Sequence, residues 1–188
     1  MPNDDAEALR IAMKKVAVTL KGADIPFALA GGYAAFARGG PESGHDVDFY
    51  LRKDDVSAAE KSLSAEGLRV EHPPEDWLVK VYDGDAMVDL IHTPTDLPVT
   101  KEMLERTDEI EVDSVAMPVL AATDLVLSKL LAMDEHYCDF AAELPVVRSI
   151  REQVDWDRLD DEASHNPFAR AFLSLLVDLG IRDQPRRT

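Results

Sequence analysis

Residues 27–51 constrain the fold more than any other part of the chain, and they read FALAGGYAAFARGGPESGHDVDFYL. An apolar strand over residues 27–30 runs into the pair Gly31-Gly32, a short helix and a glycine-rich loop, and a second strand follows over residues 46–51. Glycines after a strand let the backbone approach a ligand, and the N-terminus of a following helix offers amide donors to phosphate. The stretch therefore predicts a phosphate-binding turn between two strands.

The second strand carries Asp46 and Asp48, whose spacing of two places both carboxylates on one face. Neighbouring carboxylates repel, so they need a raised pKa, a basic partner or a divalent cation, and their oxygens suit Mg²⁺. Asp89 adds a third carboxylate within the apolar run 87–91. Two aspartates on a solvated strand would be ordinary in an acidic chain. Beside a phosphate-binding turn they favour phosphoryl or nucleotidyl transfer, in which positioning and metal charge carry most of the catalysis.

The rest of the chain is predicted to be mixed α/β first and helical afterwards. Residues 5–21 form an amphipathic helix, and strands over 79–82 and 86–91 flank Asp83-Gly84-Asp85, a strong hairpin signal. Further helices are expected over residues 33–38, 56–66 with Asp54 or Asp55 as cap, 123–133, 140–153 with a break near Pro145, and 167–179. The pattern divides the chain into a core over 1–118 and a helical C-terminal region over 119–188, packed on the core.

The chain has 188 residues, of which 37 are acidic and 20 basic, giving a net charge of -17. Such a field repels nucleic acid and anionic membranes, so nonspecific binding to either is not expected. No run of about 18 apolar residues suggests a transmembrane helix. The lone Cys138 and the polar first ten residues indicate a cytoplasmic protein.

The motifs Gly31-Gly32, Asp46-Val47-Asp48 and Asp89 together resemble the signature of the nucleotidyltransferase superfamily related to DNA polymerase β. The subgroup that the chain resembles is the bacterial AbiEii-like and MenT-like nucleotidyltransferases, many of them toxins of toxin–antitoxin pairs. The resemblance implies a mixed β-sheet flanked by helices and followed by a helical part. It also implies transfer of an NMP from an NTP to an acceptor hydroxyl. Mg²⁺ would serve as cofactor, as two ions, with Mn²⁺ as an alternative.

The same resemblance assigns roles to individual residues. Asp46 and Asp48 would be catalytic metal ligands, and Asp89 would be a further metal ligand and the base for the acceptor hydroxyl. Gly31 and Gly32 would cradle the triphosphate. The Arg and Thr that relatives carry ahead of Asp-x-Asp are absent, and Ser43 stands in that segment as a nucleotide-binding candidate.

Two residues of the helical part complete the candidate site. Lys129 lies among apolar helical neighbours, so it is a snorkelling lysine, an ion-paired structural lysine or a ligand of the triphosphate. Relatives place a lysine on this helix, which favours the last interpretation. Asp139 lies where relatives often have an aspartate that contacts this lysine or the nucleotide.

The acceptor is left open by the sequence. MenT-like toxins modify the tRNA 3′ end, and other members of the superfamily modify small molecules such as aminoglycosides, whose positive charge suits an acidic cleft. A toxin would have an antitoxin protein as partner. The alternative function is that of a catalytically silent nucleotide-binding or antitoxin-type partner protein, which the missing Arg and Thr favour.

Overall fold

The computed structural model describes residues 4–42 and 46–184. Its strands are β1 (Phe27–Ala30), β2 (Val47–Leu51), β3 (Arg69–Glu71), β4 (Leu78–Asp83), β5 (Ala86–Ile91), β6 (Asp108–Val112) and β7 (Val115–Val119). Its α-helices are α1 (Asp4–Gly22), α2 (Gly31–Ala37), α3 (Val56–Ala65), α4 (Lys101–Glu105), α5 (Ala122–Leu131), α6 (Phe140–Ile150), α7 (Trp156–Glu162) and α8 (Pro167–Asp178). Three short 3-10 helices are η1 (Lys53–Asp55), η2 (Pro94–Asp96) and η3 (Arg151–Gln153).

The strands form one seven-stranded mixed sheet in the order β3-β4-β5-β2-β1-β7-β6. β2 pairs with β1 antiparallel and with β5 parallel, so the strand that carries Asp48 lies at the centre. The parallel pairing of β2 and β5 is made across a long connection that contains α3, β3 and β4, as parallel neighbours require. The predicted mixed α/β fold, with helices around a sheet and a helical part after it, is confirmed.

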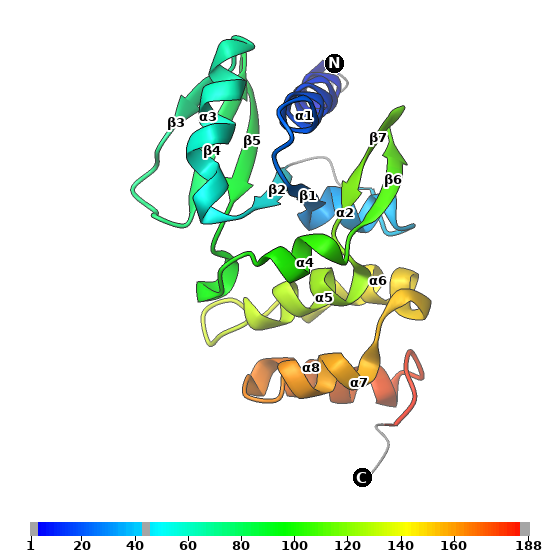
Figure 1. Cartoon of the computed structure of the whole chain (residues 1–188). Helices are drawn as coiled ribbons and strands as arrows, with labels where there is room; N and C mark the ends of the chain where they lie inside the picture. The colour runs from blue at the N-terminus through cyan, green and yellow to red at the C-terminus, as the bar shows by residue number, and fades with distance from the viewer. Residues whose placement is uncertain (1–3, 43–45, 185–188) are drawn as a thin grey trace.

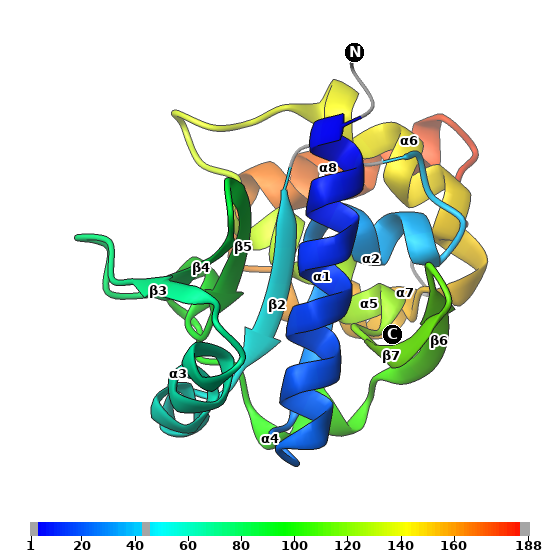
Figure 2. The same cartoon turned by 90° about the horizontal axis from the view of Figure 1, so that it is seen from above.

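The two faces of the sheet differ because side chains alternate along β2. Val47, Phe49 and Leu51 point to one face and are fully buried there. Helices α1 and α3 cover that face, and Figure 2 shows α1 running across the sheet beside β2. α1 contributes an apolar stripe that includes the fully buried Met13 and Leu20.

The other face of β2 carries Asp48 and Tyr50. Below it lie α5 and α6, with α7 and α8 as a further layer beneath them (Figure 1). Arg38, just after α2, helps to join these parts, since its guanidinium donates to the carbonyl of Leu120 at 2.7 Å, to Asp108 at 2.7 Å and to Gln153 at 3.0 Å. These contacts fix the position of the C-terminal helices relative to the sheet. Helices α5 and α6 therefore lie beneath β2 and β5, the two strands that carry the aspartates (Figure 1).

Several local expectations need correction. The second helix begins at Gly31 rather than at Tyr33. Pro145 does not break α6, which continues to Ile150 with this proline in its interior, although proline there removes one backbone hydrogen bond. Asp55 does not cap α3 through its side chain; its carboxylate binds Arg52 at 2.8 Å instead. Helices α4 and α7 and the β6–β7 hairpin were not expected.

Within residues 4–42 and 46–184, no helix has the length and apolar character that crossing a membrane requires. The division into a core over 1–118 and a helical region over 119–188 stays a prediction.

Candidate active site

Asp48 and Asp89 lie side by side in the middle of the sheet. β2 and β5 are parallel neighbours whose register pairs Asp48 with Asp89, so both carboxylates project from the same face. Lys80, on β4, is the antiparallel partner of Asp89 and donates to its Oδ1 at 3.2 Å. Two aspartates and a lysine from three adjacent strands thus meet above the C-terminal helices.

The charge of Asp48 is poorly compensated by the protein. Burial, together with the neighbouring charges of Asp89 and Asp46, raises the pKa of Asp48 to about 6, while Lys129 and Lys80 act in the opposite direction. A carboxylate with a raised pKa beside a second carboxylate is typical of a site that receives a cation or works as an acid or base. Lys129, although distant in sequence, therefore belongs to the electrostatic surroundings of Asp48.

Gly31 is required by the position of Asp48. Its φ is +59°, in the left-handed region that favours glycine, and a Cβ built on it would collide with Oδ2 of Asp48. The backbone at the end of β1 and the Asp48 carboxylate are therefore in direct contact. The glycine pair was predicted to let the backbone approach a ligand closely. In the structure the backbone at Gly31 approaches the side chain of Asp48, and a ligand bound there would contact both residues.

Replacing Gly31 by alanine should reduce transfer activity by at least about 100-fold, because the methyl group displaces the Asp48 carboxylate. The matched control is Gly84→Ala, whose φ of +62° carries a similar backbone cost but whose Cβ would meet nothing within 4 Å. Initial rates and thermal unfolding of both variants provide the comparison. Equal activity losses in the two variants would show that the contact with Asp48 is unimportant.

A cleft of about 740 Å³ opens beside the carboxylates, between the sheet and the ends of α5 and α6. Gly31, Tyr50 and Ile91 form its wall on the sheet side, and Trp77 and Tyr137 place exposed aromatic rings along it. Burial raises the pKa of Tyr50 to about 12, so this phenol stays neutral. The volume lies within the range of small-molecule and cofactor sites.

Lys129 lines the same cleft and is ion-paired. Its Nζ donates to Oε1 of Glu143 at 3.0 Å. Of the three interpretations of Lys129, the structure shows an ion-paired lysine that also faces the cleft. Binding of a triphosphate by Lys129 stays a prediction.

The other site residues predicted from the sequence differ in their exposure to solvent. Asp46 is exposed and directly precedes β2, and Gly32 lies half-buried in the first turn of α2. Asp139 is exposed and caps α6 by accepting from the backbone N–H of Ala142 at 3.0 Å. Ser43 lies outside the described residues. The structure thus brings Asp48, Asp89, Gly31 and Lys129 together, and it gives Asp139 a local role as a helix cap.

The donor set fits a hard divalent cation only in part. Asp48 and Asp89 offer carboxylate oxygens on one face, but no group of three His, Cys, Asp or Glu side chains in the described parts of the chain converges closely enough to hold an ion. Mg²⁺ is commonly bound by one or two carboxylates together with substrate phosphates and water. The pair of carboxylates therefore fits Mg²⁺ that arrives with a nucleotide better than a resident ion.

Two residues of the site escaped the sequence analysis. Lys80 was predictable, since a hairpin around Asp83-Gly84-Asp85 places it opposite Asp89. Glu143 was not, because its approach to Lys129 depends on how α6 packs against α5.

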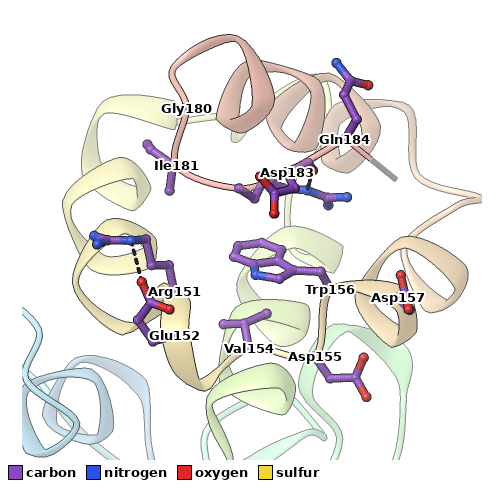
Figure 3. A pocket seen from close by; sticks show the side chains of 11 residues that line it. Arg151, Glu152, Val154, Asp155, Trp156, Asp157, Gly180, Ile181, Asp183 and Gln184 are labelled. Atoms are coloured by element: carbon purple, nitrogen blue, oxygen red, sulfur yellow. Dashed lines mark hydrogen bonds and ion pairs between the residues drawn. The ribbon is translucent and has the colours of Figure 1, made fainter. Parts of the chain in front are cut away.

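A second cleft, of about 610 Å³, lies between the start of α7 and the segment after α8 (Figure 3). Trp156 stands in it, and the guanidinium of Arg182 lies 5.0 Å from the ring centroid. Arg182 is buried and pairs with Asp160 at 2.8 Å and 2.5 Å. These charges satisfy one another, and the candidate aspartates are elsewhere, so this cleft is not the active site.

The two aspartates, the glycine turn and the cleft are arranged as nucleotidyl transfer requires, and the family to which the chain belongs carries out this class of reaction. The chain belongs to the family described as "Uncharacterised nucleotidyltransferase", whose model matches residues 4–184. It is therefore an enzyme of the nucleotidyltransferase type. No curated protein sequence matches the chain.

Solved structures show the same fold at low sequence identity. ANT(2″)-Ia in complex with adenylyl-2″-tobramycin has a TM-score of 0.60 at 14% identity, covering 88% of this chain and 97% of that one. An antigenic nucleotidyltransferase-like protein from Paracoccidioides brasiliensis has a TM-score of 0.55 at 14% identity, covering 93% and 89%. A putative nucleotidyltransferase from Thermotoga maritima has a TM-score of 0.53 at 17% identity, covering 66% and 83%. These likenesses establish the fold.

Proposed function

We propose that this enzyme transfers an NMP from an NTP to an acceptor hydroxyl in the presence of Mg²⁺, and that Asp48 and Asp89 carry the reaction. The observation that supports this most is the in-register pair of aspartates on β2 and β5, of which Asp48 contacts Gly31 at the edge of a cleft of about 740 Å³. Family membership supports the reaction class. Asp46, exposed directly before β2, is the further ligand we assign.

The residues divide the work between the two substrates. Bound Mg²⁺ would neutralise charge on the triphosphate. The backbone at Gly31-Gly32 would face the phosphates, and Lys129 would contact them from the opposite side of the cleft. The acceptor oxygen forms a bond to the α-phosphorus, the bond from that phosphorus to the bridging oxygen of the β-phosphate breaks, and pyrophosphate leaves. Asp89 takes the proton of the acceptor hydroxyl.

This proposal has two versions, which differ in the acceptor: a small molecule or the 3′ end of a tRNA. ANT(2″)-Ia, which shares the fold, was solved with an adenylylated aminoglycoside, which supports a small-molecule acceptor. The AbiEii-like and MenT-like resemblance supports a tRNA 3′ end and an antitoxin partner in the cytoplasm. The net charge of -17 disfavours nucleic acid.

A transfer assay decides between these versions. The purified chain is incubated with Mg²⁺ or Mn²⁺ and each of four α-labelled NTPs, together with total tRNA, aminoglycosides or no acceptor. Label on tRNA supports the toxin version, and label on a small molecule supports the other. NTP binding without transfer to any acceptor would instead favour the catalytically silent partner protein.

Removing the cleft lysine should weaken nucleotide binding. Lys129→Met is expected to raise the KM for NTP by about tenfold or more, since an ammonium contact to phosphate is a charge-assisted hydrogen bond. Lys15→Met is the matched control, because Lys15 is also partly buried and paired with an aspartate, Asp83, at 2.9 Å. If the KM for NTP is unchanged in Lys129→Met, Lys129 does not contact the nucleotide, and its role is only the structural ion pair with Glu143.

A further inference from the structure

Glu143 is a buried carboxylate that lines the cleft, and one of its two oxygens is unpaired among the residues that the structure describes. Its side chain is 9% exposed and lines the cleft from α6. Oε1 accepts from Lys129 at 3.0 Å, whereas Oε2 is buried and has no hydrogen-bond partner in the described part of the chain. The described residues therefore provide a hydrogen-bond donor for one oxygen of this carboxylate and none for the other.

An unsatisfied buried oxygen is costly, and more so on a charged group. Such atoms are rare in native proteins and call for an explanation, and a group that binds there and completes the hydrogen bond is one. A carboxylate only accepts hydrogen bonds, so the completing group must be an N–H or O–H donor, and a cationic donor gains most from the charge. Phosphate oxygens are excluded as partners, since they are acceptors and negatively charged.

The remainder of the cleft favours a cation as well. Among the described residues that line it, Lys129 is the only Lys or Arg side chain, and it is already paired, while Asp134 and Glu143 are acidic. Trp77 and Tyr137 are 42% and 56% exposed and lie along the cleft. Aromatic faces next to carboxylates suit an ammonium group on a ring-shaped polyol, through cation–π contact and packing.

We propose that Glu143 binds an ammonium group of the acceptor, so that the acceptor is a small hydroxylated amine rather than a nucleic acid. This inference rests on the proposed function, because it identifies the acceptor of the same site. It makes Glu143 a specificity-determining residue and leaves the transfer of the NMP to the aspartates.

Binding measured by calorimetry tests the inference independently of catalysis. Tobramycin and its fully N-acetylated form are titrated into the full chain without NTP or metal, and into Glu143→Gln and Glu135→Gln. Glu135→Gln removes one carboxylate from an exposed position outside the cleft and serves as the control. We expect Glu143→Gln to weaken tobramycin binding by at least about tenfold, Glu135→Gln to change it less than about twofold, and the N-acetylated form to bind as weakly to wild type as tobramycin does to Glu143→Gln.

Kinetics then separate this inference from the proposed function. In Glu143→Gln, a rise in the KM for the amine acceptor that exceeds any change in the KM for NTP supports it. A raised KM for NTP alone would overturn it, because Glu143 would then serve only to position Lys129 or to contact the nucleoside. Transfer to tRNA alone, or equal binding of the amine and its N-acetylated form, would also overturn it while the nucleotidyltransferase function stood. Amine binding that depends on Glu143, without any transfer, would leave this inference intact and remove the proposed function.

Discussion

The Asp48→Asn variant is expected to be more stable than the wild-type chain at pH 8 without divalent cations, and to have lost about a thousandfold of its transfer activity. The two effects share one cause. Asp48 is partly buried beside Asp89, so its negative charge is unfavourable without a bound cation and useful only when one is bound. Loss of a ligand that holds the metal charge costs several kcal/mol of transition-state stabilisation.

The pH dependence of the stability difference follows from the pKa of Asp48, which rises from 3.8 to about 6 on folding. Between these values the folded state binds more protons than the unfolded state, so stability falls as the pH rises. The cost is fully present above about pH 6 and amounts to roughly 2–3 kcal/mol. Asparagine carries no charge, so the advantage of Asp48→Asn should vanish towards pH 4.

Urea unfolding from pH 4 to pH 8, with and without Mg²⁺, measures this difference. Asp46→Asn is the control for stability, because Asp46 is exposed and its change should stay within about 0.5 kcal/mol. Added Mg²⁺ together with a nonhydrolysable NTP should stabilise wild type and not Asp48→Asn. If Asp48→Asn is less stable than wild type at every pH, the interpretation of Asp48 as an unfavourable charge is wrong.

The sequence was informative wherever the chemistry depends on local spacing. Period two along β2 placed Asp48 on the face opposite to Phe49, and the Asp83-Gly84-Asp85 turn placed β4 against β5. The pairing of Asp48 with Asp89 could be expected only from the family resemblance. It depends on a parallel contact of two strands separated by α3, β3 and β4, and local periodicity carries no information on that register.

Features that depend on packing or on unusual turns were missed. The β6–β7 hairpin turns through Asp113 and Ser114 at φ of 49° and 67°, where glycine or asparagine would have marked the turn. Glu143 lies two residues before Pro145, in a stretch expected to break, so its position opposite Lys129 could not be anticipated. Both cases show tertiary contacts overriding local preference.

Loss of the Asp124 charge is expected to destabilise the protein by about 3–5 kcal/mol, a large part of the stability of a domain of this size. Asp124 lies in the first turn of α5, and its side chain is fully buried. Arg106 donates to its two oxygens at 3.0 Å and 2.8 Å, and Arg158 of α7 donates at 2.5 Å. One carboxylate therefore ties the segment before β6, the helix that carries Lys129 and the C-terminal helices.

Asp124→Asn leaves the two arginines facing each other without the charge that they share. Urea unfolding measures the loss, and Glu162→Gln is the matched control. Glu162 pairs with the same Arg158 at 2.6 Å, but on the surface, where such pairs contribute less than about 1 kcal/mol. A loss in Asp124→Asn as small as that in Glu162→Gln would mean that solvent replaces the buried network.

The pH dependence provides a second check on the same network. Burial alone would raise the pKa of Asp124, but the hydrogen bonds from Arg106 and Arg158 outweigh it and lower the pKa below 3.8. A lowered folded-state pKa gives stability that is fully present above the unfolded-state value and is lost as the pH falls. The difference between wild type and Asp124→Asn should therefore be constant from pH 8 to about pH 5 and shrink below about pH 4. A difference that already shrank between pH 8 and pH 6 would show that the pKa of Asp124 is not lowered, and so that its carboxylate is not held by its two arginines.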